Sequence, residues 1–172
     1  MRHAISVLLQ NEVGALTRLT GMFSTRGYNI DSLNVAPTDD ETVSRVTLVV
    51  TGSDAAIAQL NAQLAKLVDV VNIHDMTLGD HFERELAIVK LKTNEDTTRV
   101  RSFAERHSAE ILDESTNSFT MQLHGRIAEI DAFVDEAPSV GQVSAVARSG
   151  SVAVSKGEVL LSSFDQHHKL SG

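Results

Sequence analysis

The side chains that could do chemistry are sparse in this 172-residue chain and do not gather into a known catalytic motif. Cysteine is absent, which excludes disulfides, thiolate metal sites and cysteine nucleophiles. No two glycines are spaced GxG, and no GxxxxGK[ST] or GxSxG sequence occurs, so the dinucleotide, P-loop and hydrolase fingerprints are missing. The seven histidines show no HExxH or HxH spacing: they are His3, His74, His81, His107, His124, His167 and His168. The sequence therefore favours a protein without catalytic residues of its own.

Two acidic groups could in principle bind a metal ion. Asp80, His81 and Glu83 offer oxygen and nitrogen ligands, although a solvated linker explains them better. Residues 39–41 (Asp-Asp-Glu) offer the oxygen ligands that Mg²⁺ and Ca²⁺ prefer. A turn between two strands also favours Asp, and this is the simpler interpretation. We therefore predict no resident metal.

The loop at residues 10–16 (QNEVGAL) has the residue types of a binding site for a small amino acid. Gly14 leaves the backbone open in the first turn of a predicted helix, where free N–H groups and the helix dipole attract a carboxylate. Nearby carbonyl groups and the side chain of Asn11 could take an ammonium group, and Leu9, Leu16 and Ile30 could line an apolar slot. The residues alone favour a plainer interpretation, in which Asn11 caps the helix and Gly14 eases its packing on the sheet.

Hydrophobic periodicity places this loop in a βαββαβ unit, the ferredoxin-like order. Strands are predicted at residues 4–10, 29–36, 43–51 and 69–76. One helix follows Asn11 and ends at Gly27, which suits the left-handed position after a helix. The second helix has its apolar residues at helical spacing, namely Ile57, Leu60, Leu64 and Leu67.

The same order of elements begins again after residue 84. Strands are predicted at residues 86–92, 110–114, 118–124 and 143–148. One helix follows an Asn94 cap, with His107 as a half-buried residue of its apolar face, and the other ends near Pro138. The predicted fold class is α+β, with two ferredoxin-like βαββαβ domains, each a four-stranded antiparallel sheet with two helices on one face. The predicted boundaries are 1–78 for the first domain, 79–84 for a linker, 85–158 for the second domain and 159–172 for a flexible tail that holds His167 and His168.

The outer face of the first sheet predicts self-association. This face, turned away from the helices, is half apolar and is formed by Ala4, Ser6, Leu8, Arg45, Thr47 and Val49. Such a surface is too apolar to face water comfortably. A domain of about 75 residues also gains little stability from its own core. We therefore predict a homodimer.

Composition excludes several classes of partner. The formal net charge is −8, so binding to nucleic acid or to anionic lipid is unfavourable. Aromatic residues make up 4% and tryptophan is absent, which disfavours base stacking. No apolar run approaches the ~20 residues that span a bilayer, and the N-terminal apolar run is too short for a signal peptide. We predict a cytoplasmic protein that binds neither nucleic acid nor membranes.

The sequence resembles the regulatory (small) subunits of acetolactate synthase, also called acetohydroxyacid synthase, whose first domain is an amino-acid-binding ACT domain. The resemblance is carried by SVLLQNEVGALTRLTGMFSTRGYNIDSLNVAPTDDETVSRVTLVV (6–50), KLVDVVNIHD (66–75), FERELAIVKLK (82–92) and VARSGSVAVSKG (146–157). The most specific segment is RGYNIDSLNVAPTDD. The resemblance covers about residues 2–160.

The resemblance implies a regulatory subunit without catalytic activity, active in branched-chain amino-acid biosynthesis. Its partner would be a catalytic large subunit that holds thiamine diphosphate, Mg²⁺ and FAD, with no cofactor on this chain. The small subunit would activate this partner and confer allosteric feedback inhibition by valine, with leucine or isoleucine as other possible effectors. The effector would lie at an interface between two subunits. One subunit would supply Asn11, Gly14, Ala15 and Leu16, and the other would supply Asn29 and Ile30.

Two departures from the family pattern bear on feedback. Val13 stands where many ACT loops have proline, so the loop is expected to be less rigid. Lys156 stands where arginine is expected near the end of the second domain. Both leave the overall pattern intact and put only the strength of feedback in question.

Three other functions fit parts of the sequence. The chain could be an ACT-type amino-acid-binding module for a different metabolic enzyme or for a transcription regulator, although no residues remain for a DNA-reading element. It could be a small ferredoxin-like enzyme that uses His74 or His124. It could also be a purely structural dimerisation protein, which would bind no amino acid.

Overall fold

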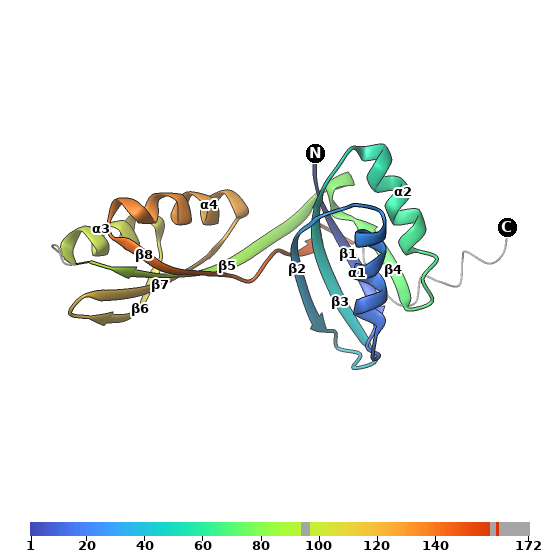
Figure 1. The fold of residues 1–172 in the computed structure, drawn as a ribbon, viewed down its shortest axis with the longest axis horizontal. Helices are drawn as coiled ribbons and strands as arrows, with labels where there is room; N and C mark the ends of the chain where they lie inside the picture. Colours follow the sequence, from blue (N-terminus) through green and yellow to red (C-terminus); the bar gives the residue numbers. More distant parts are fainter. Residues whose placement is uncertain (94–96, 159–160, 162–172) are drawn as a thin grey trace. The chain divides into compact units, whose positions relative to one another are not determined.

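In the computed structural model, which describes residues 1–93, 97–158 and 161, the chain forms two successive βαββαβ arrangements (Figure 1). The first contains β1 (Arg2–Gln10), α1 (Ala15–Thr25), β2 (Ile30–Pro37), β3 (Val43–Thr51), α2 (Asp54–Leu64), β4 (Val70–Asp75) and the 3₁₀ turn η1 (Met76–Leu78). The second contains β5 (His81–Lys92), α3 (Thr97–His107), β6 (Glu110–Ser115), β7 (Ser118–Gly125), α4 (Ile127–Glu136), the 3₁₀ turn η2 (Ala137–Ser139) and β8 (Gln142–Arg148). A short strand, β9 (Val152–Ser155), follows. The predicted fold class is confirmed.

Both sheets are antiparallel, with strand orders β2-β3-β1-β4 and β6-β7-β5-β8. The second sheet differs from the prediction in one respect, because β9 also pairs with β5. The predicted boundaries also differ from the structure. Of the described residues, one compact unit contains 1–82 together with 151–158 and 161, and the other contains 83–93 and 97–150. Most of the predicted linker belongs to a strand, since β5 begins at His81.

The core of the first unit lies between its sheet and both of its helices, which cover the same face (Figure 1). Alternate residues of the central strand, Ile5, Val7 and Leu9, point into this core. The helices contribute residues at helical spacing: Ala15, Leu19 and Phe23 from α1, and Ile57, Leu60 and Leu64 from α2. Ser53 caps α2 by accepting a hydrogen bond from the backbone N–H of Ala56. The predicted stripe of the second helix is thus confirmed for Ile57, Leu60 and Leu64, whereas Leu67 lies beyond the end of α2 and packs against the core only partly buried.

The outer face of the first sheet is not exposed as the sequence suggested. Ala4, Ser6, Leu8, Thr47 and Val49 are all at most 3% exposed. Ala4 packs with Met76 of η1 and Ala153 of β9, the strand that the prediction missed. Arg45 donates hydrogen bonds to Ser6 Oγ and to the carbonyl of Leu161. The homodimer prediction therefore cannot rest on this face.

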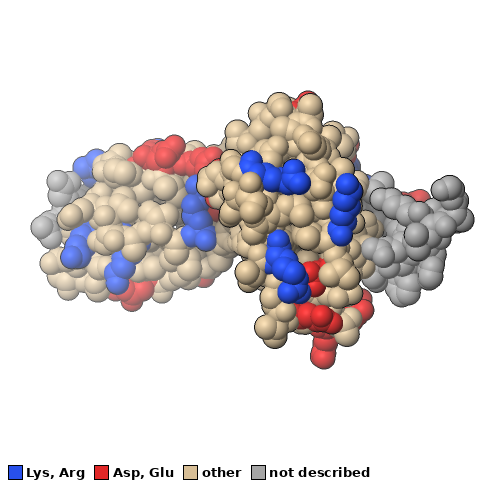
Figure 2. Space-filling model, turned by 45° about the vertical axis from the view of Figure 1, so that its right-hand side comes forward, with Lys and Arg blue, Asp and Glu red and all other residues tan. Residues whose placement is uncertain are grey.

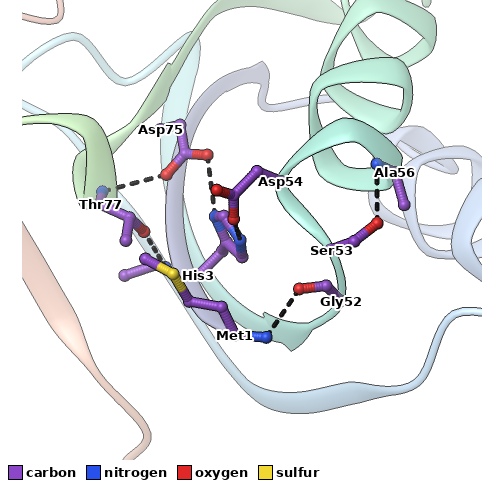
Figure 3. Close-up of polar contacts among 9 residues, drawn as sticks. Met1, His3, Gly52, Ser53, Asp54, Ala56, Asp75 and Thr77 are labelled. Atoms are coloured by element: carbon purple, nitrogen blue, oxygen red, sulfur yellow. Dashed lines mark hydrogen bonds and ion pairs between the residues drawn. The ribbon is translucent and has the colours of Figure 1, made fainter.

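The side chain of His3, at the start of β1, lies close to β4 and to the start of α2 (Figure 3). Its imidazole is buried, and Nδ1 lies 3.2 Å from Oδ2 of Asp75 on β4. Nε2 lies 3.3 Å from Oδ1 of Asp54, the first residue of α2. Asp75 also accepts a hydrogen bond from the backbone N–H of Thr77. His3 therefore links the central strand to its neighbour and lies beside the start of a helix.

The core of the second unit repeats this arrangement, with α3 and α4 on one face of the sheet (Figure 1). Phe103 and Phe133 stack with their ring centroids 5.3 Å apart. His107 lies beside both rings with 14% of its side chain exposed, so its predicted half-buried position is confirmed. The predicted Asn94 cap and the His167-His168 pair lie outside the described residues.

Two features of the described residues concern binding to nucleic acids and to membranes. On the face shown in Figure 2, acidic and basic side chains lie in small groups among uncharged ones. That face shows no broad basic surface of the kind that binds nucleic acid. None of the helices in the described part of the chain is long and apolar enough to cross a membrane.

Candidate functional site

The loop between β1 and α1 turns at Gly14, whose φ is +85°. This left-handed conformation favours glycine, and it makes Gly14 the residue that precedes the first helical turn. Asn11 does not cap the helix as predicted. Its Nδ2 instead donates to the carbonyl of Glu41 at 2.9 Å, and its backbone N–H donates to the carbonyl of Thr42. Asn11 therefore ties the loop to the turn between β2 and β3.

The first turn of α1 is left open to an anion. No side chain caps it, and no acidic residue lies in it. The N–H of Ala15 donates to the carbonyl of Glu12, and that of Arg18 donates to the carbonyl of Gly14. The N–H groups of Leu16 and Thr17 have no hydrogen-bond acceptor within the described part of the chain. Free N–H groups and the positive end of the helix dipole favour a carboxylate here.

Arg18 and Asp69 brace this turn with an ion pair that the sequence interpretation did not find. Arg18 Nε and Nη2 donate to the two carboxylate oxygens of Asp69, both at 2.7 Å. Asp69 is 3% exposed, and its backbone carbonyl accepts the N–H of Gln10 at the end of β1. The hydrogen bonds from Arg18 lower the pKa of the Asp69 carboxyl, and the same pairing raises the pKa of Arg18. Both groups therefore stay charged near neutral pH.

The predicted effector residues of the loop differ in how they can meet a ligand. The side chain of Ala15 is 1% exposed and packs in the core, so only its backbone can face a ligand. Leu16 is 37% exposed and Val13 is fully exposed. Leu16 therefore offers an apolar surface beside Gly14.

The other two predicted residues, Asn29 and Ile30, lie at the opposite end of the sheet. Ile30 pairs with Val50, and Val50 pairs with His3 near the start of β1, whereas the loop follows Gln10 at the end of β1. His3 and Gln10 are seven residues apart along this strand, which is roughly 23 Å at about 3.3 Å per residue. Asn29 is exposed and donates to Oδ1 of Asp31. Within one chain, the structure therefore does not bring the two groups together.

The alternative chemistries gain no support from the geometry of the described residues. No group of three or more Asp, Glu or His side chains among them is arranged to hold a metal. Asp40 accepts hydrogen bonds from the backbone N–H and Oγ1 of Thr42, which lower the pKa of its carboxyl and form a turn. His81 Nδ1 contacts the carbonyl of Gly79. The turn interpretation of residues 39–41 therefore fits the structure.

Comparisons with known proteins agree over most of the chain. Residues 5–72 match the model of the AHAS small subunit-like ACT domain, and residues 84–157 match that of the small subunit of acetolactate synthase. The acetolactate synthase isozyme 3 small subunit of Escherichia coli (strain K12) is 42% identical over 162 residues, which cover 94% of this chain and 99% of that protein. The acetolactate synthase small subunit of Haemophilus influenzae is 40% identical, covering 92% and 98%. The crystal structure of the small subunit from Thermotoga maritima superposes with a TM-score of 0.83 at 30% identity, covering 92% and 99%.

Proposed function

This chain belongs to the family of acetolactate synthase small subunits, and we propose that it activates a catalytic large subunit and makes it sensitive to valine. Its relatives are named as small subunits and carry an ACT-type regulatory domain, so catalysis belongs to the large subunit. Thiamine diphosphate, Mg²⁺ and FAD would reside on that partner, with none bound by this chain. The second unit would help to bind or activate the partner. We expect the complex to work in the cytoplasm.

The open first turn of α1 is the observation that carries the proposal of an effector. Leu16 and Thr17 present backbone N–H groups without acceptors in the described residues, at the positive end of a helix. Asn11 and neighbouring carbonyl oxygens would take the ammonium group, and the exposed side chain of Leu16 would contact an aliphatic chain. Valine fits this set. Leucine and isoleucine fit it nearly as well, because one methylene in an apolar pocket discriminates only ~10–200-fold.

A homodimer through β2 would complete the site. Among the described residues β2 pairs only with β3, so its other edge is open. In a two-fold antiparallel pairing of two β2 edges, the start of one strand lies beside the end of the other. That end is Pro37, which pairs with Ser44, and Ser44 pairs with Leu9 just before the loop. Ile30 of the partner subunit would thereby be brought to the level of the loop.

The other edge of the same sheet is less suited to pairing. On β4, the backbone N–H of Ile73 donates to Oδ1 of its neighbour Asn72 at 2.8 Å. A side chain that occupies an edge donor hinders the addition of another strand. This favours β2 over β4 as the edge at which two copies meet.

The proposal is tested by acetolactate formation with the matching catalytic subunit alone, with this chain, and with this chain plus L-valine. We expect the chain to raise the rate and valine to lower it again. An unchanged rate with a folded chain would contradict the proposal and favour a different partner enzyme. Turnover of pyruvate without any partner would instead indicate an enzyme. A thermal-shift panel of amino acids identifies the effector, because a ligand at ~100 times its Kd adds about 2.7 kcal/mol of stability.

Two substitutions test the placement of the effector. Asn11→Ala removes the side chain that donates to the carbonyl of Glu41, and Asn29→His alters the other half of the proposed site. Both are expected to weaken inhibition by valine while activation persists. Loss of activation in step with loss of inhibition would indicate misfolding and would contradict the assignment of a separate effector site.

A further inference from the structure

Arg18 has one guanidinium nitrogen that its ion pair does not use. Nε and Nη2 are both occupied by the carboxylate of Asp69. Nη1 makes no hydrogen bond with any residue that the structure describes. The side chain is 48% exposed, so a ligand can approach it. An arginine held on one side of its planar fork keeps a directed donor available on the other.

This free nitrogen lies directly against Gly14. A Cβ atom built on Gly14 would come within 2.7 Å of Nη1, closer than atoms can pack. The absence of a side chain at Gly14 therefore gives the guanidinium room as well as permitting the left-handed φ. The free donor thus lies at the residue that precedes the open first turn of α1.

Asp69 fixes the position of the Arg18 guanidinium. Asp69 is buried, and its own backbone anchors Gln10 at the start of the loop. A charge-assisted bidentate pair has a defined geometry as well as strength. Removing Asp69 would therefore change where Nη1 points and not only the charge nearby.

We propose that Nη1 of Arg18 binds the carboxylate of the effector amino acid, with Asp69 and Gly14 as the residues that position it. This inference rests on the proposed function, because it assumes an amino-acid effector at this loop. Glu12 is the competing anion. It is exposed in the same loop, and its charge contributes to raising the pKa of Arg18, but no hydrogen bond joins the two in the described structure. Effector binding would displace this weak attraction.

The test compares two ligands that differ in the carboxylate alone. L-Valine and L-valinol share the ammonium group and the isopropyl side chain, and NMR titration of the full chain follows even weak binding. We expect Arg18→Lys and Arg18→Gln to weaken valine binding about 10–150-fold, the value of one hydrogen bond to a charged group. Valinol binding is expected to stay within about threefold of wild type. Arg18→Lys keeps a cation beside Asp69, so the buried carboxylate is not left unpaired.

Two further variants sharpen the test. Arg101→Gln is the matched control, because Arg101 also pairs with a carboxylate, that of Glu114, but lies in the second unit. It should change the affinity for neither valine nor valinol. Glu12→Gln removes the competing anion and should tighten valine binding by up to about fivefold, the range of an exposed ion pair.

The possible results separate this inference from the function it rests on. Equal loss of valine and valinol binding in the Arg18 variants would show that Arg18 only braces the loop, and would overturn the inference. Unchanged valine binding would overturn it as well. In both of these cases the proposed function still holds, provided that the wild-type chain activates the catalytic subunit and binds valine. A wild-type chain that binds no valine overturns both.

Discussion

Replacing Gly14 by alanine should destabilise the first unit through two separable effects. The first is the left-handed φ of +85°, which costs an L-residue about 1–2 kcal/mol. The second is the contact of the new Cβ with Nη1 of Arg18, which must shift and so disturb its hydrogen bonds to Asp69. Nη1 is the end of a flexible, half-exposed side chain, so its displacement adds only a smaller cost to the backbone part. We therefore expect Gly14→Ala to cost somewhat more than the backbone part alone, which is about 1–2 kcal/mol.

Two other glycines of the same unit provide the controls. Gly27 has a similar φ of +73° but nothing within 4 Å of a Cβ, so Gly27→Ala should cost only the backbone part, about 1–2 kcal/mol. Gly21 lies inside α1, also with open space around it, and Gly21→Ala should stabilise by about 0.8–1 kcal/mol through helix propensity. The difference between the variants at 14 and 27 isolates the contact with Arg18.

Urea unfolding followed by circular dichroism measures these free energies. The expected order of stability is Gly21→Ala, wild type, Gly27→Ala and then Gly14→Ala. Gly14→Ala should also weaken inhibition by valine, since the displaced guanidinium no longer lies at the open turn. Equal destabilisation at positions 14 and 27 would refute the packing of Arg18 against Gly14. A Gly14→Ala variant as stable as wild type would refute the backbone argument too.

Two further predictions concern charged contacts elsewhere in the two units. His3→Leu removes one of the two hydrogen-bond partners of the buried Asp75 carboxylate and should cost about 1–3 kcal/mol. Asp54→Asn alters a carboxylate whose side chain is 75% exposed and should cost less than about 1 kcal/mol. Equal urea midpoints for the two variants would contradict the role given to His3. Hydrogen bonds from His107 and Arg106 lower the pKa of Glu136 below 4.5, so this pairing stabilises the native state above about pH 4.5 and the benefit is lost as the pH falls through the native value. Glu136→Gln should therefore be less stable than wild type at pH 7, and the gap should narrow as the pH falls through the lowered native pKa of Glu136. A gap that keeps the same size throughout acid titration of the folded chain would contradict this reasoning.

Periodicity was sufficient to predict both βαββαβ repeats because each helix buries a regular stripe. Leu19 and Phe23 in α1, and Leu60 and Leu64 in α2, lie in the core as their spacing indicates. β9 escaped prediction because its four residues are too short for a period, and because it pairs with a strand about 70 residues earlier in the chain. Its presence also explains why the outer sheet face around Ala4 is covered.

The candidate loop shows where local sequence rules give way to tertiary contacts. Asn11 has a strong intrinsic preference for capping, but the carbonyl of Glu41 takes its side chain and the helix begins later, after Gly14. Arg18 was missed because its partner Asp69 is 51 residues away. One local signal could have pointed to it: side chains in a helix lean toward its N-terminus, so a residue four positions after Gly14 can reach back to the loop.

The separation of the two halves of the proposed site by roughly 23 Å within one chain has a genetic consequence. In a two-fold dimer, each site would combine the loop of one copy with the β2 start of the other. Two alleles that each abolish inhibition, one altered at Asn11 and one at Asn29, would then complement each other in a mixed dimer. One of its sites would carry both defects, and the other would be fully wild type. A cell that expresses both alleles should recover part of the valine sensitivity that each allele alone has lost.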